Sequence, residues 1–346
     1  MNSFTYTRAG DVAAAVREVA ANGEAKFIAG GTNLIDLMKE NVERPNRLID
    51  INSLPLAQIR PGPNGGLRIG ALVTNSDLAY HPEIEKRYPI VSKTILSGAS
   101  AQLRNMATTG GNLMQRTRCV YFYDKATPCN KREPGSGCSA IDGVNKNHAI
   151  LGTSEHCIAT HPSDLCVALA ALEAVVQVTG PRGKRAVPFS EFHRLPGDTP
   201  HLDTNLRADE IITAVDLPAK GFAEHHTYLK IRERTSYAFA LVSVAAALEM
   251  DGETIREARL ALGGVAHKPW RDRRAEAILH GQRATRDNFR AVGEALLRDA
   301  KGFGQNDFKV ELAKRSVVRA LAQAAFKSDF QFFQTVQHGP TRADGV

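Results

Sequence analysis

The chain has 346 residues, of which 43% are hydrophobic and 23% charged, as in ordinary soluble globular proteins. The net charge of +7 is spread along the chain, and the single tryptophan and seven tyrosines offer few platforms for stacking on bases, so the composition disfavours nucleic-acid binding. No stretch approaches the roughly 20 apolar residues of a membrane span. The N-terminus lacks the basic start and apolar segment of a signal peptide, so we expect no export by the chain's own sequence.

In the first half of the chain, the pattern predicts helices and short strands in mixed order. Asp11 can cap a first helix, and Asn22-Gly23 can end it. The apolar runs that follow predict strands at 26–29, 47–51 and 67–72, and mainly helix at 76–106. The stretch from about 110 to 159 has no apolar period and is rich in Cys, Gly, Lys and Asn. We expect a long ordered loop there, which needs a functional reason inside a compact domain.

The second half continues the mixed order and contains a change in composition. Ser163 can cap a helix over 165–174, which a strand at 175–178 follows. Near 218–222 the composition changes, and we place a domain boundary there. Beyond it the pattern predicts strands within 228–250 and at 257–265, then helices near 271–281, 286–299 and 307–328. The mixed order predicts the α+β class rather than a repeating βαβ array.

A pair of glycines directly follows the first predicted strand, in the turn Gly30-Gly31-Thr32-Asn33. Successive glycines let consecutive backbone N–H groups point into one concavity, which suits a pyrophosphate. Thr32 and Asn33 add side-chain donors. The same pattern is also common as a purely structural turn, and no G-x-G-x-x-G motif is present to indicate a Rossmann site.

Two further motifs offer polar groups beside flexible backbone. The first is Thr108-Thr109-Gly110-Gly111-Asn112, where hydroxyl groups, an amide side chain and the accessible backbone of two glycines occur together. The same segment can equally be a tight turn. His161-Pro162-Ser163-Asp164 opens a helix, where Ser163 and Asp164 can serve as N-cap and first-turn acid or contact a ligand.

All five cysteines lie within 48 residues of the chain. That clustering, the odd number and the missing signal peptide argue against disulfides and favour a metal site. Cys166 falls on the apolar face of the helix predicted at 165–174, where a small buried hydrophobe is expected. The spacing C-x9-C-x8-C-x18-C of the other four is not the C-x2-C of zinc ribbons, which disfavours zinc without excluding it, and four thiolates can hold an iron–sulfur cluster. The predicted ligands are therefore Cys119, Cys129, Cys138 and Cys157. Basic residues lie between and beside these cysteines: Arg116, Arg118, Lys125, Lys131 and Arg132. They can offset the negative charge of the thiolates, or they can simply reflect a loop that is exposed to solvent.

Taken together, the motifs resemble the FAD-binding subunits of the xanthine dehydrogenase and carbon monoxide dehydrogenase family. The resemblance rests on Lys26-Phe27-Ile28-Ala29-Gly30-Gly31-Thr32-Asn33-Leu34, on 107–112 and on 162–165, and it extends through 228–232 and 261–266. It covers nearly the whole chain, to about residue 325. It implies a PCMH-type fold of two α+β subdomains that enclose FAD, over residues 1–218, then a smaller C-terminal α+β domain at 222–328 and a tail at 329–346.

The resemblance also implies roles for individual residues. The segment 26–34 would carry the pyrophosphate, and the flavin or its linker would contact Thr108, Gly111 and Asn112. Asp164 would accept a hydrogen bond from the ribityl chain or ring edge. Lys230 would approach the isoalloxazine, unless it is a surface lysine on a strand. Met114 can lie near the ring or fill the core.

The cysteine loop resembles the insertion in the flavin subunit of periplasmic aldehyde oxidoreductases, where the cluster is 4Fe–4S. This resemblance implies a heterotrimer with a molybdopterin-binding large subunit and a small subunit that carries 2Fe–2S clusters. The present chain would pass electrons through FAD to an external acceptor, with no catalytic acid or base of its own. It would act in the cytoplasm, or in the periplasm after export with a signal-bearing partner. The alternatives are a flavin subunit of a xanthine or aromatic-CoA type hydroxylase, a stand-alone flavin reductase, and a zinc protein.

Overall fold

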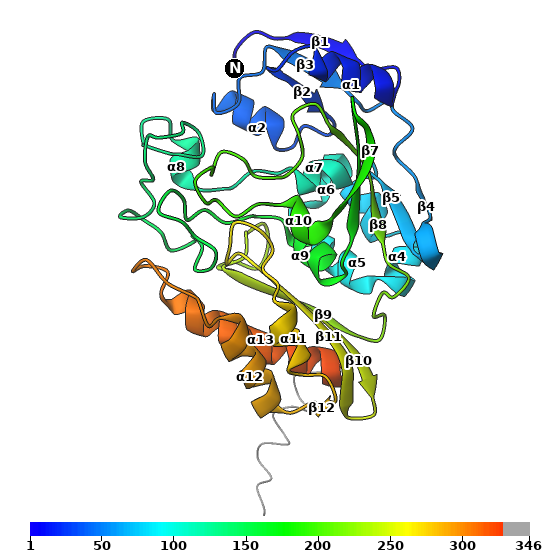
Figure 1. Ribbon diagram of the computed structural model, residues 1–346, viewed down its shortest axis with the longest axis vertical. Coiled ribbons are helices and arrows are strands. Elements are labelled where there is room, and N and C mark those ends of the chain that lie inside the picture. Colours follow the sequence, from blue (N-terminus) through cyan, green and yellow to red (C-terminus); the bar gives the residue numbers. More distant parts are fainter. Residues whose placement is uncertain (328–346) are drawn as a thin grey trace, which may run out of the picture.

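The computed structural model describes residues 1–327, which form three sheets with helices packed around them (Figure 1). The mixture of parallel and antiparallel strands with helices confirms the predicted α+β class. The predicted tail, 329–346, lies outside the described residues. Within the described part, no helix has the length and apolar character needed to cross a membrane.

The first sheet is parallel and small, with the strand order β1 (Thr5–Arg8), β3 (Arg47–Asp50) and β2 (Ala25–Ile28). Helix α1 (Val12–Ala20) packs on it through an apolar face. The Asp11 carboxylate accepts a hydrogen bond from the Ala14 N–H at 2.7 Å, which confirms the predicted cap. Strand β2 leads through the Gly-Gly turn into α2 (Leu34–Lys39).

The second sheet is antiparallel and has the order β4 (Ile59–Pro61), β5 (Leu67–Gly70), β8 (Ile211–Leu217), β6 (Val175–Gly180) and β7 (Gly183–Pro188). A 3-10 turn at Pro63–Gly65 joins β4 to β5. The helices of this part of the chain are α3 (Asn75–Ala79), α4 (Pro82–Arg87), α5 (Pro89–Leu96), α6 (Ala101–Met106), α7 (Thr109–Leu113), α9 (Asp164–Ala171) and α10 (Phe189–Phe192). The stretch predicted as mainly helical is thus a series of short helices, because Pro82 and Pro89 each begin a new one. Residues 165–171 of α9 are all buried, which explains why that helix is apolar on every side.

The cysteine loop runs between α7 and α9 with little regular structure, as predicted. Only the short helices α7 and α8 (Val120–Tyr123), neither of which was expected, interrupt 110–159. Side chains hold the loop together: the Arg132 guanidinium donates to the carbonyls of Tyr121 and Phe122 at 2.7 and 2.9 Å. The Asn130 carboxamide accepts from the backbone N–H groups of residues 135 and 137.

The C-terminal sheet is antiparallel, with the order β12 (Gln282–Arg283), β11 (Thr254–Gly263), β10 (Val242–Asp251) and β9 (His225–Ile231). Three helices accompany it: α11 (Arg273–Ala277), α12 (Arg286–Leu296) and α13 (Phe308–Phe326). Alternate residues of β10 point to opposite faces. Val244 and Ala246 join the core under α12 and α13, whereas Ala245 and Ala247 join the core that contains α9. The C-terminal sheet is therefore packed directly against the N-terminal part.

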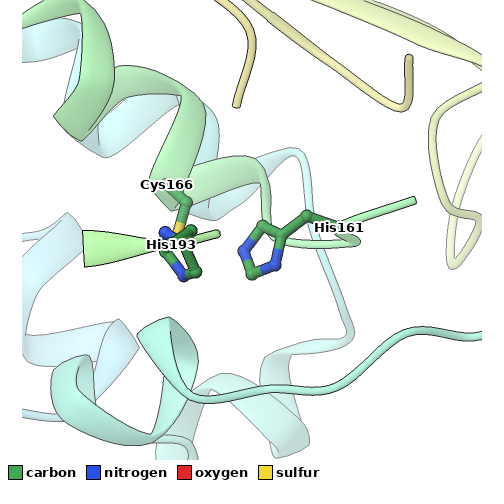
Figure 2. A group of neighbouring side chains, drawn as sticks. All are labelled: His161, Cys166 and His193. Carbon is green, nitrogen blue, oxygen red and sulfur yellow. The ribbon is translucent and has the colours of Figure 1, made fainter. Parts of the chain in front are cut away.

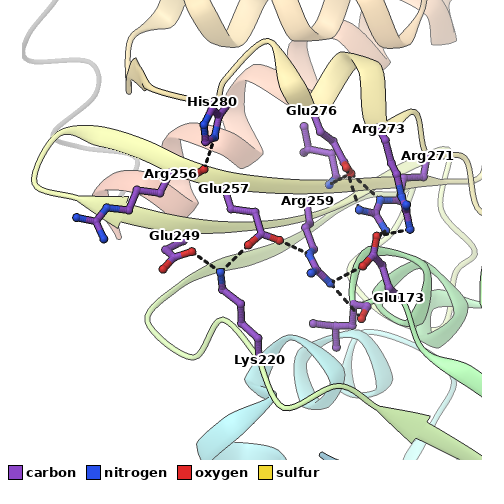
Figure 3. Close-up of polar contacts among 12 residues, drawn as sticks. Glu173, Lys220, Glu249, Arg256, Glu257, Arg259, Arg271, Arg273, Glu276 and His280 are labelled. Atoms are coloured by element: carbon purple, nitrogen blue, oxygen red, sulfur yellow. Dashed lines mark hydrogen bonds and ion pairs between the residues drawn. The ribbon is translucent and has the colours of Figure 1, made fainter. Parts of the chain in front are cut away.

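An ionic network also ties the two parts together (Figure 3). Glu173, two residues after the end of α9, forms ion pairs with three arginines. Its carboxylate oxygens lie 3.3 Å from a guanidinium nitrogen of Arg259 on β11, 3.0 Å from one of Arg271 and 2.6 Å from one of Arg273. Lys220, between β8 and β9, pairs with Glu249 and Glu257 on β10 and β11. Each cluster therefore adds ion pairs between the two parts of the chain.

Candidate functional site

A cavity of about 790 Å³ opens where the N-terminal part meets β9 and the loop after it. This volume lies within the roughly 300–1,000 Å³ that is typical of small-molecule and cofactor sites. Its wall combines the turn after β2, the segments around α6 and α7, the start of α9, and residues from 230 to 243. Five cationic and three carboxylate side chains line it. The excess of two positive charges suits an anionic ligand.

The turn after β2 presents unpaired donors to this cavity. Thr32 and Asn33 line the cavity, and within residues 1–327 the backbone N–H groups of Gly31, Thr32 and Asn33 donate no backbone hydrogen bond. The Asn33 Oδ1 accepts from the Arg116 N–H at 2.9 Å, while its buried Nδ2 has no partner among the described residues. The turn can therefore donate several hydrogen bonds to a bound anion.

Both glycines of this turn are sterically required. A Cβ on Gly30 would lie 1.7 Å from the carbonyl oxygen of Met106, the last residue of α6. Gly31 has a φ of +71°, a left-handed conformation that glycine adopts at little cost. The turn is thus pressed against the α6 backbone, which holds its N–H groups in place.

The Thr108–Asn112 motif forms the start of α7. The Thr108 hydroxyl is buried and accepts from the Gly111 N–H at 3.2 Å as the helix cap, and Thr108 is not among the residues that line the cavity. Gly111 and Asn112 do line it. The Asn112 Oδ1 accepts from Ser163 Oγ and from Gln115 Nε2, so this motif and the start of α9 are joined by a hydrogen bond.

Asp164 and Lys230 form a buried ion pair in the cavity wall. Lys230 Nζ lies 2.8 Å from Asp164 Oδ2, and their side chains are only 5% and 11% exposed. The Tyr228 hydroxyl donates to Asp164 Oδ1 at 2.5 Å. Lys230 is thus a buried residue of the site rather than a surface lysine, although its contact with a flavin stays a prediction. Ser163 caps α9 through the Cys166 N–H at 3.1 Å, which confirms the predicted cap.

The four predicted ligand cysteines surround a second, smaller hollow of about 10 Å³. Cys119 lines it from the position directly before α8 and the other three from separate parts of the loop, and the backbones of Cys129 and Cys138 pair with each other. Among the described residues, these four cysteines do not appear as a close group of metal-ligating side chains; that description applies to His161, Cys166 and His193.

The surroundings of these thiols are buried and supply hydrogen-bond donors. Burial, with a smaller contribution from the neighbouring thiols, raises the pKa of Cys119 to about 12 and that of Cys157 to about 11. Free thiolates are therefore unfavourable here, whereas a bound metal deprotonates its thiols outright. The Ala159 N–H donates to the Cys157 sulfur at 3.4 Å. Of the five basic residues in the loop, Lys131 is the one beside Cys157 that favours its thiolate, and its side chain is only 1% exposed.

Cys119 connects the two cavities. It lines the small hollow and also the 790 Å³ cavity, to which the other three predicted ligands do not contribute. His148 Nε2 lies 3.1 Å from its sulfur. Burial and the nearby Lys309 lower the pKa of His148 to about 4, so this imidazole is neutral at pH 7.

Cys166 is fully buried, as the sequence predicted, and lies beside two histidines (Figure 2). The ligand atoms of Cys166, His161 and His193 all lie within 4.8 Å of one another. His193 Nε2 lies 2.9 Å from the Leu113 carbonyl, and burial lowers the pKa of His193 to about 4. Cys166 and His193 line neither of the two cavities described above, and we assign this trio a packing role.

Comparison with known proteins decides the family. Residues 2–220 match the family described as "FAD binding domain in molybdopterin dehydrogenase", and residues 227–324 match "CO dehydrogenase flavoprotein C-terminal domain". The chain belongs to the FAD-binding subunits of the molybdenum hydroxylases. The aldehyde oxidoreductase FAD-binding subunit PaoB of Escherichia coli (strain K12) is 51% identical over 94% of this chain and 99% of the relative.

More distant flavoproteins of this family share the fold. The putative xanthine dehydrogenase FAD-binding subunit XdhB of E. coli (strain K12) is 25% identical over 92% of this chain and 95% of its own length. A solved structure of carbon monoxide dehydrogenase from Hydrogenophaga pseudoflava superposes with a TM-score of 0.73 at 26% identity, over 94% of this chain and 98% of that chain.

Not every predicted cofactor residue reaches the large cavity. The six that line it are Thr32, Asn33, Gly111, Asn112, Asp164 and Lys230. Lys26 to Gly31 and Leu34 position the turn from behind, as Thr108 does for α7. Sequence analysis missed four cationic lining residues, which are Arg104, Arg118, Lys146 and Arg234. The buried Nε atoms of Arg104 and Arg118 have no partner within residues 1–327. Arg118 was noted as a basic residue of the cysteine loop but was given no cofactor role.

Proposed function

We propose that this chain is the FAD- and 4Fe–4S-containing electron-transfer subunit of a molybdenum-dependent aldehyde oxidoreductase. The observation that carries the aldehyde assignment is the 51% identity, over nearly the full length of both chains, to a protein named an aldehyde oxidoreductase subunit. The xanthine dehydrogenase relative is only half as similar, at 25%. The partners in this proposal are a molybdopterin-binding large subunit and a 2Fe–2S small subunit, which is in keeping with relatives named as subunits or medium chains.

Three features of the large cavity support FAD as its ligand. Its volume is appropriate, its charge excess is positive, and the turn at Gly31–Asn33 offers unpaired N–H groups of the kind that bind a pyrophosphate. The ion pair of Asp164 and Lys230 would present a fixed dipole to the polar edge of the ligand. When bound, FAD would supply two-electron chemistry and an iron–sulfur cluster one-electron chemistry.

The four cysteines support the cluster. They come from separate segments of the loop and line one hollow. The hydrogen bond from Ala159, the ring nitrogen of His148 beside Cys119 and the charge of Lys131 are surroundings that suit a cluster with several negative charges. In this proposal the protein binds and orients the cofactors, and no side chain acts as an acid or base.

Cofactor analysis of the full chain, purified without oxygen, tests this proposal. We expect about one FAD and four iron atoms per polypeptide. Stoichiometric zinc without iron would refute the cluster, and a colourless protein without flavin would refute the cavity assignment. Reconstitution with the co-expressed partner subunits then tests the substrate: oxidation of aldehydes, with xanthine left unchanged, is the expected result.

A further inference from the structure

We infer that His148 is a positioning residue that holds Cys119 by an N–H···S hydrogen bond and thereby raises the reduction potential of the cluster on its flavin-facing side. This inference rests on the proposed 4Fe–4S site and adds a residue that the sequence motifs do not contain. The direct observation is the 3.1 Å contact between His148 Nε2 and Cys119 Sγ.

The hydrogen-bond inventory of the ring determines where its proton belongs. A neutral imidazole carries one N–H, and a cysteine that ligates iron is a thiolate that only accepts. His148 is buried, and its Nδ1 has no partner among the described residues. A proton on Nδ1 would leave a buried donor unpaired, whereas a proton on Nε2 donates to the sulfur. The second arrangement is therefore favoured once Cys119 is a ligand.

The backbone of His148 is fixed from the opposite domain. Its carbonyl accepts from Lys309 Nζ at 2.8 Å and from Asn306 Nδ2 at 3.3 Å, and Lys309 also donates to the Gly264 carbonyl. Lys309 is fully buried at the start of α13. These contacts fix the backbone from which the imidazole reaches Cys119, and the 3.1 Å contact is already present without a cluster. The hydrogen bond to Cys119 is therefore preorganised rather than formed on cluster binding.

The position of this pair gives the contact a role in electron transfer. Cys119 and His148 both line the 790 Å³ cavity, whereas Cys129, Cys138 and Cys157 line only the small hollow. Hydrogen bonds to the sulfurs are among the factors that set cluster potentials. A donor stabilises the reduced, more negative state more than the oxidised one, so its removal lowers the potential.

The test is a redox titration of the cluster in the full chain, followed by electron paramagnetic resonance with dithionite as the reductant. His148→Leu removes the donor, whereas His148→Gln keeps an N–H of similar reach. We expect the leucine variant to keep its iron. Its equilibrium constant for reduction of the cluster should fall at least tenfold, which is a reduction potential about 59 mV lower for one electron. The glutamine variant should stay near the wild-type potential. His226→Leu, which removes another partly buried imidazole from β9, should leave the potential unchanged.

Each other outcome decides between the claims. Wild-type protein without iron refutes the proposed function itself. Four irons with an unchanged potential in His148→Leu overturn the present inference alone. If that variant loses its cluster, wild-type protein with 15N-labelled histidine provides the test: the reduced cluster must show a hyperfine coupling to a histidine nitrogen that His148→Gln abolishes. No such coupling in the wild type also overturns the inference.

Discussion

The replacement Gly30→Ala tests the geometry of the proposed pyrophosphate turn. Its Cβ would lie 1.7 Å from the Met106 carbonyl oxygen, and Cβ contacts below 3.0 Å essentially do not occur, so the two backbones must separate by about 1.3 Å. A shift of that size breaks hydrogen bonds from the turn to a bound anion. One such bond to a charged group is worth about 1.5–3 kcal/mol, which corresponds to a roughly 10- to 150-fold weaker Kd for FAD.

The assay is FAD per polypeptide after purification, with the Kd from flavin fluorescence on titration of FAD into flavin-free protein. Gly23→Ala is the matched control, because a Cβ at Gly23 meets nothing within 4 Å. We expect the control to bind FAD as the wild type does. A folded Gly30→Ala protein with full flavin content and an unchanged Kd would show that the ligand's phosphates bind elsewhere.

Three further changes have defined outcomes. Gly31→Val places a branched side chain at a φ of +71°, so we expect it to lose FAD but keep its iron, as absorbance and metal analysis would show. Burial alone would raise the pKa of Asp203, but Lys131 and Arg116 hold it well below its usual range. The stability from this carboxylate is thus present above about pH 4 and lost as the pH falls further. In urea unfolding at pH 7, Asp203→Asn should have a free energy of unfolding about 3–5 kcal/mol lower than that of the wild type. This difference should become smaller in acid, and a difference that does not change with pH would contradict the reasoning. Glu173→Gln should lower the free energy of unfolding by about 1–3 kcal/mol, because it removes the charge that pairs with three arginines. The loss is limited because one of these arginines, Arg273, is mostly exposed. A Tm equal to that of the wild type would show that the network is dispensable.

Local signals in the sequence predicted much of this structure. The caps at Asp11 and Ser163, the turn at Gly30-Gly31 and the burial of Cys166 depend on neighbouring residues or on helical periodicity, and the structure has each of them. The four predicted ligand cysteines were proposed from the clustering of the cysteines in the sequence and from the position of Cys166 on an apolar helix face, and the four line one hollow.

Features that depend on contacts between distant segments were not predictable. Strand β8 carries a clear apolar pattern that sequence analysis passed over, and only the pairing shows that it lies between β5 and β6. Strand β7 was missed because it is a charged edge strand with one buried residue. The burial of Lys230 follows from the packing of β9 against the start of α9, which the sequence of β9 alone does not show.

The central claim is that four specific thiolates hold a 4Fe–4S cluster in a FAD-binding subunit. Its most direct test is iron per polypeptide, with the electron paramagnetic resonance spectrum of the dithionite-reduced protein, across Cys→Ser variants of all five cysteines. The replacements of Cys119, Cys129, Cys138 and Cys157 should lose iron and the cluster signal, because iron binds a hydroxyl less well than a thiolate. Cys166→Ser should keep four irons and the signal and lose only about 1–3 kcal/mol of stability. Loss of the cluster in Cys166→Ser, together with its retention in Cys157→Ser, would contradict the ligand set.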